Sequence, residues 1–225
     1  MPIITISRCS YNYGKEVAQA VAKALGYKCI SREELLDASK EFNMPGIKLI
    51  RELPIILEQT IFNKYRYISY IRSTLLKHLI KDNIVYHGFC GHVFVQGIDH
   101  VLKVQITADL EDRVKRIMDR DGFSRNCAQL FIESMDDARK KWYQKLYNVD
   151  LSKIGQYDIS LNISKFPRDR AVNIICKVAQ LNRFQATPES KKAMNDLFIN
   201  TVIKPSEFSD SDLKYINSMA CLLGG

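Results

Sequence analysis

A glycine and a lysine open a predicted helix directly after an apolar strand and a short polar turn. Residues 3–7 are mostly apolar and β-branched, and a helical pattern follows from residue 15 to residue 25. At such a junction, backbone N–H groups and the positive helix end face an anion, and a lysine neutralises it. The candidate phosphate-binding residues are therefore those of the turn and the helix start: Ser10, Tyr11, Asn12, Tyr13, Gly14, Lys15 and Glu16.

The turn departs from the pattern G-x-x-x-x-G-K-[ST] of a phosphate-binding loop. That pattern requires glycine where the chain has Cys9, and serine or threonine where it has Glu16. Gly14 tolerates the positive φ that a phosphate nest needs, whereas the rings of Tyr11 and Tyr13 restrict close approach of the backbone to a phosphate. An ordinary strand–helix turn is the alternative interpretation.

A second group of residues consists of arginines with helical spacing. Arg113, Arg116 and Arg120 share one predicted helix face, and Asp136 and Arg139 follow on the next helix. Guanidinium groups bind phosphate through two parallel donors, and phosphoryl transfer needs several of them around the oxygens that gain charge. The alternative is a solvated face on which arginines pair with neighbouring carboxylates.

Two further positions follow predicted strands, where ligands gather in an open α/β sheet. Arg32 lies at a helix start after the second strand, where it could bind an anionic substrate or simply belong to a surface helix capped by Ser31. Gly88 ends the third strand, and Gly91 follows, so the chain can turn there and a ligand can come near. His87 and His92 lie in the same stretch. They could be structural residues that pack in the core or residues that take part in chemistry.

Composition limits the class of protein. The chain has 225 residues, of which 46% are hydrophobic, and a net charge of +8. A basic chain can bind nucleic acid, but we find no motif for that role, so nucleic acid is an unlikely partner and a phosphorylated small molecule is favoured. The six cysteines form no C-x-x-C pair and predict reduced thiols, and no apolar run is long enough to span a membrane. We therefore expect a cytoplasmic protein that binds no structural metal; the sequence does not indicate an oligomeric state.

Strands that alternate with helices predict an α/β fold, in which a central parallel sheet has helices on both faces. The expected strands cover residues 3–7, 27–30, 84–88, 101–106 and 157–163. The expected helices cover residues 15–25, 32–42, 47–59, 63–81, 110–120, 124–147 and 168–182. We expect one main domain over residues 1–183, followed by a linker and a helical appendage over residues 184–225, which could be a shortened add-on domain.

These residues together resemble the cytidylate kinase-like group of P-loop nucleoside monophosphate kinases. The resemblance covers about residues 2–180 in order, and its most specific parts are the opening strand and the segment Arg120-Asp121-Gly122. It implies a three-layer P-loop fold and transfer of a phosphoryl group from ATP, with Mg²⁺, to CMP or a related monophosphate. It also implies that residues 10–16 hold the ATP phosphates, and that Arg32 and Gly88 border the acceptor. Lys15 and a set of arginine-helix and lid residues would then carry catalysis or hold substrate: Arg113, Arg116, Arg120, Asp136 and Arg139.

The chain differs from that group at two loops. The group typically has Gly-Ser-Gly-Gly where this chain has residues 11–14, and Gly-Arg-Gly where it has residues 88–90. No serine or threonine follows Lys15 to hold Mg²⁺, so the ligands of the metal are not identified. We therefore expect weak or absent kinase activity, and we expect glycine at positions 11 and 13 to strengthen ATP binding. The alternative function is a nucleotide-binding regulatory module with impaired catalysis.

Overall fold

A single parallel sheet forms the centre of the molecule. The computed structural model describes residues 2–8, 13–31, 34–35, 61–88, 91–147 and 155–201. Within these ranges the sheet has five strands in the order β2-β3-β1-β4-β5, and every neighbouring pair is parallel. The strands are β1 (Ile3–Arg8), β2 (Lys28–Ser31), β3 (Ile84–His87), β4 (Val101–Thr107) and β5 (Ile159–Asn162). The predicted α/β class and all five predicted strands are confirmed.

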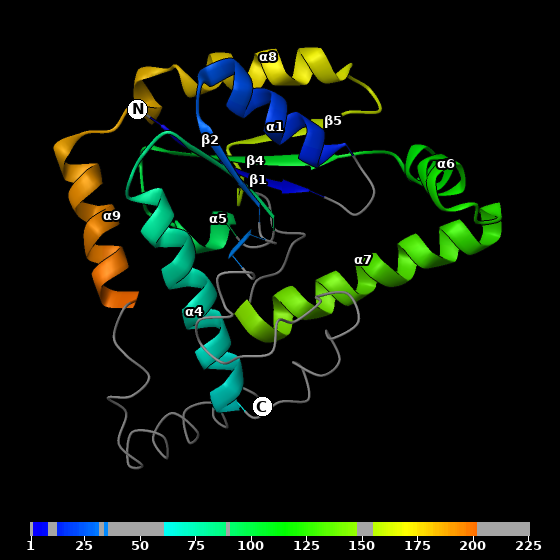
Figure 1. Cartoon of the computed structure of the whole chain (residues 1–225), viewed down its shortest axis with the longest axis horizontal. Helices are drawn as coiled ribbons and strands as arrows, with labels where there is room; N and C mark the ends of the chain where they lie inside the picture. Colours follow the sequence, from blue (N-terminus) through cyan, green and yellow to red (C-terminus); the bar gives the residue numbers. More distant parts are fainter. Residues whose placement is uncertain are drawn as a thin grey trace.

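Helices cover both faces of the sheet (Figure 1). Those described are α1 (Gly14–Leu25), α4 (Ile61–Leu79), α5 (Gly91–Phe94), α6 (Leu110–Asp121), α7 (Arg125–Tyr147), α8 (Arg168–Ala179) and α9 (Pro188–Thr201), with a short 3-10 helix, η2 (Asn182–Phe184). None of these described helices combines the length and the apolar character that crossing a bilayer requires. The helix expected over residues 47–59, and most of the one expected over residues 32–42, lie outside the described residues.

The central strand β1 is buried, as its β-branched sequence predicts. Its Ile4 lies opposite Val85 of β3 and Leu102 of β4. Successive side chains of a strand point to opposite faces. Accordingly, Ile4 and Ile6 pack under α1 and α8, whereas Ile3 packs on the face covered by α4 and α5.

Helix α1 carries the predicted phosphate-binding end to the edge of the sheet where the strands end. Its buried residues form one stripe, Val17, Ala18, Val21 and Ala22, which packs on the sheet. The helix ends at Gly26, whose φ of 69° lies in the left-handed region that glycine adopts without strain. The chain then returns directly into β2.

The residues at the N-cap positions of two helices differ in what their side chains do. Ser31 forms a reciprocal capping box with Glu34, since the Glu34 N–H donates to the Ser31 hydroxyl at 3.2 Å and the Ser31 N–H donates to the Glu34 carboxylate at 3.1 Å. Asp109 occupies the N-cap position of α6, but its side chain caps no N–H of that helix. Its carboxylate instead accepts a hydrogen bond from the Asn162 amide at 2.7 Å, which links the end of β5 to the start of α6.

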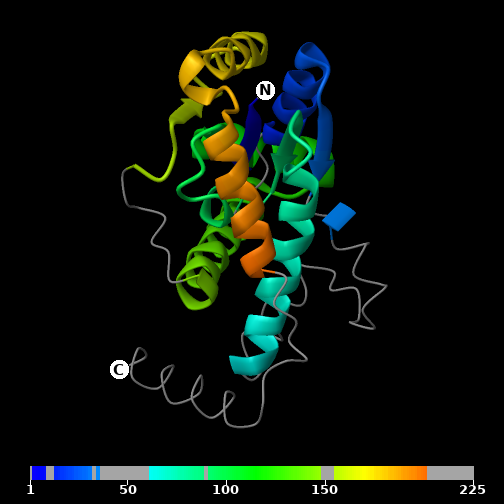
Figure 2. The same cartoon turned by 90° about the vertical axis from the view of Figure 1, so that its left-hand side faces the viewer.

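Helix α9, the last one within the described residues, packs along α4, as Figure 2 shows in orange and cyan. Met194 of α9 is buried in the hydrophobic cluster that α4 and α5 form over the sheet, with Leu197 and Phe198 against it. Lys191 also pairs with Asp82, which follows α4, at 3.0 Å. The division of the chain near residue 184 stays a prediction, but α9 shares its core with the rest of the described chain.

Gly91 is required by packing inside the protein. A Cβ added there would lie 2.6 Å from the Tyr86 ring and 3.2 Å from Cβ of Thr5. The first of these distances is far below van der Waals contact, so only glycine lets α5 approach β3 and β1 this closely. The space that a Cβ of residue 91 would occupy is thus filled by the Tyr86 ring.

Candidate functional site

The candidate site begins where β1 ends and α1 starts. Gly14 opens α1 and is buried, whereas the side chain of Lys15 is exposed beside it. Tyr13 is the N-cap residue, and no side-chain hydrogen bond caps the helix. The first N–H groups of a helix have no partner within it, so this end can receive an anion. Among the predicted phosphate-binding residues, Ser10, Tyr11 and Asn12 lie outside the described residues.

Arg116 brings the arginine helix to this end of α1. Its guanidinium donates to the Glu16 carboxylate across 100 positions of sequence. Burial raises the pKa of Glu16, but this hydrogen bond, a backbone N–H and the charges of Arg116 and Arg168 outweigh burial, so the pKa lies below its ordinary value. Nη1 of Arg116 is buried and has no hydrogen-bond partner among the described residues. A ligand oxygen that reached this nitrogen would supply the acceptor that it lacks.

Arg139 brings the following helix to the other side of the same loop. Its Nη1 donates to the backbone carbonyl of Arg8, the last residue of β1. Helices α6 and α7 therefore hold the two flanks of the segment between β1 and α1, one through Glu16 and one through Arg8. Figure 1 shows α6 beyond this edge of the sheet, with α7 returning beneath it.

The printed contacts of the other two predicted arginines lie on α6 and α7 themselves. Arg113 has a side chain only 8% exposed, and both its terminal nitrogens donate to Asp136 of α7. Arg120 is exposed and pairs with its neighbour Asp121. The structure therefore brings Arg116 and Arg139 together around the loop, and it uses Arg113 and Asp136 to join α6 to α7.

A third arginine, which the sequence analysis did not select, lies over the loop. The guanidinium carbon of Arg168 lies 4.4 Å from the centre of the Tyr13 ring, and that of Arg116 lies 3.7 Å from it. Both are within the range of cation–π attraction. Arg168 is the first residue of α8, directly after Phe166-Pro167 and six positions after the end of β5 at Asn162. The same rule that selected Arg32, a cation at a helix start after a strand, would have found it.

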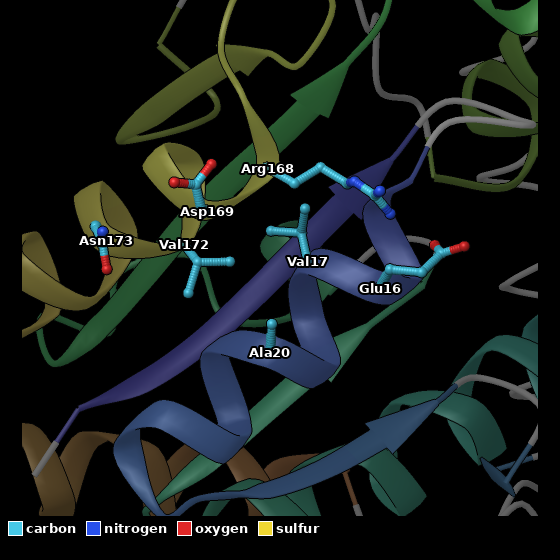
Figure 3. A pocket seen from close by; sticks show the side chains of 7 residues that line it. All are labelled: Glu16, Val17, Ala20, Arg168, Asp169, Val172 and Asn173. Carbon is cyan, nitrogen blue, oxygen red and sulfur yellow. The ribbon is translucent and has the colours of Figure 1, made fainter.

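A shallow groove runs beside this contact, between the first turns of α1 and α8 (Figure 3). Its volume is about 330 Å³, with Val17, Ala20 and Val172 along its floor. Figure 3 shows Arg168 extended from α8 toward the first turn of α1, where Glu16 lies. The groove therefore places an apolar strip next to two arginines at the carboxyl edge of the sheet.

The predicted acceptor residues are described only in part. Gly88 follows β3, and its N–H donates to the carbonyl of Ile6 at 3.2 Å, so it lies beside the end of β1. Asp136 is held by Arg113, and Arg32 lies outside the described residues. Gly88 and the flanks of the phosphate loop are thus neighbours at one edge of the sheet.

A buried histidine lies beneath the same edge. Nδ1 of His92, in α5, is 2.9 Å from the hydroxyl of Ser7 near the end of β1, and the Tyr157 ring lies tilted against the His92 ring, with 4.4 Å between the ring centres. Burial lowers the pKa of His92 to about 4, against an opposing contribution from Gln156, so the ring is uncharged at neutral pH. His92 therefore packs the base of the site, and the sequence did not reveal its partner because Ser7 is 85 positions away.

The fit to the cofactors of the expected reaction differs between ATP and Mg²⁺. The start of α1, Lys15 and the free donor of Arg116 suit the phosphates of a nucleotide. Among the described residues no group of three acidic, histidine or cysteine side chains is placed to hold a metal ion, and Glu16 is already paired with Arg116. These residues do not form a site that fits Mg²⁺, so no step below depends on the metal.

This geometry can be compared with known proteins. Residues 3–165 match the sequence profile of the cytidylate kinase-like family. The chain belongs to the cytidylate kinase-like family. It is 27% identical over 185 residues to a cytidylate kinase of Archaeoglobus fulgidus, a match that covers 81% of this chain and 97% of that protein. It is 29% identical over 96 residues to a cytidylate kinase of Staphylothermus marinus, which covers 43% of this chain and 54% of that one.

A solved structure shows a similar fold. An uncharacterized protein from Eubacterium ventriosum superposes with a TM-score of 0.62 and 22% identity, covering 79% of this chain and 97% of that protein. At this identity the likeness concerns the fold alone. Family membership and fold agree with the resemblance seen in the sequence.

Proposed function

We propose that this member of the cytidylate kinase-like family is an ATP-dependent phosphotransferase acting on CMP or a related nucleoside monophosphate. The observation that carries the proposal is the convergence of Arg116 and Arg139 on the flanks of the loop that precedes α1. In phosphoryl transfer the protein mainly positions the reactants and stabilises charge on the transferred group. Two arginines and a helix start at one edge of the sheet suit that role.

The site residues that the structure describes have different parts in the proposal. The backbone N–H groups at the start of α1 and the ammonium group of Lys15 bind ATP phosphates. Arg116 offers its free Nη1 to a phosphate oxygen, and Arg139 holds the carbonyl of Arg8 and so fixes the start of the loop. Arg113 and Asp136 fix the angle between α6 and α7, while a direct role for Arg120 requires its pair with Asp121 to open.

The acceptor is proposed to lie beyond β3. Gly88 follows that strand and lies beside β1 through its hydrogen bond to Ile6. Arg32 follows β2 in the sequence, and β2 pairs with β3. A monophosphate bound near Gly88 and Arg32 would face the ATP phosphates across the end of β1.

A second candidate function is a nucleotide-binding regulatory module without turnover. The supporting observation is the Glu16–Arg116 pair, in which a carboxylate occupies one arginine at the phosphate-binding end of α1. A regulatory protein could retain ATP binding with this pair closed, whereas a kinase would need Arg116 during the reaction.

Calorimetry and a product assay distinguish these functions. ATP, CMP and inorganic phosphate are titrated with and without Mg²⁺, and CDP formation is measured by separation of the nucleotides. The kinase proposal expects ATP and CMP binding and CDP formation that falls at least tenfold in Arg116→Ala. Arg183→Ala is the control, because Arg183 is exposed and pairs with Asp99 away from the loop. ATP binding without CDP formation would favour the regulatory module, and no nucleotide binding would refute both.

A further inference from the structure

Tyr13 stands where the family resemblance implies glycine, and its ring has a defined place in the structure. It contacts the guanidinium groups of Arg116 at 3.7 Å and of Arg168 at 4.4 Å. We call these three residues the tyrosine–arginine clamp. The clamp joins the start of α1 to α6 and α8, three elements that are otherwise far apart in the sequence. The ring is 37% exposed, so the contact lies at the mouth of the site.

The contact with the ring does not itself use the hydrogen-bond donors of either arginine. A guanidinium that stacks on a ring uses its face, whereas its N–H groups point outward in the plane and can still bind an anion. Arg116 illustrates this arrangement, since one terminal nitrogen donates to Glu16 while Nη1 has no partner among the described residues. Stacking therefore restricts the orientation of each arginine without occupying its hydrogen-bonding edge.

Ordering an arginine before a ligand arrives favours binding. A free arginine loses rotamer entropy when it closes on a phosphate, and a side chain already held in place loses less of it. Lysine or a mobile arginine would not offer the same fixed pair of donors. The clamp also keeps two positive charges next to the N-terminus of α1, where like charges would separate if nothing held them.

We propose that Tyr13 is a positioning residue, whose ring orients Arg116 and Arg168 toward the phosphates of the nucleotide. This inference rests on the proposed function, because it assigns the ligand to the same site. It gives Tyr13 a role opposite to the steric one expected from the sequence. In the steric hypothesis, the ring narrows the loop, so removing it strengthens ATP binding. In the positioning hypothesis, removing the ring weakens ATP binding.

Two substitutions at Tyr13 distinguish the effect of the aromatic ring from the effect of side-chain size. Tyr13→Phe keeps a ring on which both guanidinium groups can stack, whereas Tyr13→Leu keeps an apolar side chain without a π face. Tyr27→Leu is the control, since Tyr27 follows the other end of α1. ATP and inorganic pyrophosphate are titrated by calorimetry into the full chain and each variant, and thermal unfolding checks that the fold is retained.

We expect Tyr13→Phe and Tyr27→Leu to bind ATP within twofold of the parent chain, and Tyr13→Leu to bind about tenfold more weakly. In the ligand-free parent, the Nε–H NMR signals of Arg116 and Arg168 should carry ring-current shifts that Tyr13→Leu removes and Tyr13→Phe retains. A merely structural role would not give rescue by phenylalanine together with these shifts.

Other outcomes overturn the inference in distinguishable ways. Equal ATP affinity in the parent and Tyr13→Leu would refute the positioning role and leave the proposed function standing. Tighter binding by Tyr13→Leu would show instead that the ring obstructs the site. No binding of ATP or pyrophosphate by any of the proteins would refute nucleotide binding, and the positioning role with it.

Discussion

Arg113 and Asp136 form a two-point contact between consecutive helices. The two terminal nitrogens of the guanidinium donate to the two carboxylate oxygens at 2.8 and 2.9 Å. The arginine is almost fully buried, whereas the aspartate is 31% exposed. This geometry fixes α6 against α7, and with it the distance between Arg116 and Arg139, which hold the two flanks of the phosphate loop.

Removal of Asp136 should destabilise this pair of helices. Asp136→Ala removes the acceptor of two hydrogen bonds from the buried guanidinium of Arg113, which we expect to lower the free energy of unfolding by about 2–4 kcal/mol. Urea unfolding measures the change, and hydrogen exchange in α6 and α7 locates it. Asp137→Ala is the control, because the adjacent carboxylate is 68% exposed and its nearest cation, Lys140, is 4.0 Å away. Equal effects of the two substitutions would show that the Arg113 contact adds no stability.

Lys15 should contribute directly to nucleotide binding. Its ammonium group lies at the positive end of α1, where a charge-assisted contact to phosphate contributes roughly 1.5–3 kcal/mol. Lys15→Ala is therefore expected to weaken ATP binding at least tenfold, as measured by calorimetry. Lys23→Ala, an exposed lysine in the last turn of the same helix, should leave the affinity unchanged. Unchanged affinity in Lys15→Ala would place the phosphates elsewhere.

The sequence predicted the sheet because its signals are local. The run from Ile3 to Ile6 is β-branched, Gly26 stops α1, and Ser31 with Glu34 forms a cap within four residues. Each signal acts between neighbours in the chain, so the predicted bounds of the strands and helices lie close to the observed ones. The parallel direction of the strands was predictable from the alternation of strands and helices.

The partners of the site residues were not predictable in the same way. Arg113, Arg116 and Arg120 have the same spacing and chemistry in the sequence, yet one is buried on Asp136, one reaches Glu16, and one stays at the surface. The difference depends on where α6 lies relative to α1 and α7, which is set by tertiary packing. The clamp around Tyr13 likewise joins residues more than 100 positions apart, and no local pattern marks it.

His92 should make the stability of the protein depend on pH. The pKa of His92 in the folded chain is about 4, against about 6.5 for an unperturbed histidine, so the unfolded chain binds the proton first as the pH falls. The free energy of unfolding should therefore be highest above pH 6.5 and fall by about 3 kcal/mol by pH 4 from this residue alone. Urea unfolding at steps between pH 4 and 7.5 measures the slope.

The contribution of His92 is isolated by substitution. His92→Gln removes the titrating ring and should flatten the curve in this pH range, at the cost of some stability at neutral pH. His78→Gln is the comparison, since His78 is less buried, although burial and nearby lysines also lower its pKa. A curve for His92→Gln with the full parental slope would show that other groups carry the pH dependence.

The last helix should unfold together with the sheet. Met194 of α9 is 2% exposed and packs in the cluster that includes Leu75 and Leu79 of α4. We expect Met194→Ala to lower the free energy of unfolding by about 2–4 kcal/mol, from the lost burial and the cavity left behind. Circular dichroism and the fluorescence of Trp142, the single tryptophan, should then report one shared transition at a lower urea concentration.

Met118→Ala in α6 is the control, because Met118 is 38% exposed and its loss should change the free energy of unfolding by less than about 0.5 kcal/mol. If residues 184–225 instead form an independent unit, Met194→Ala will leave the Trp142 transition where it is in the parent, because loosening α9 would then not expose the core that the sheet shares with α4.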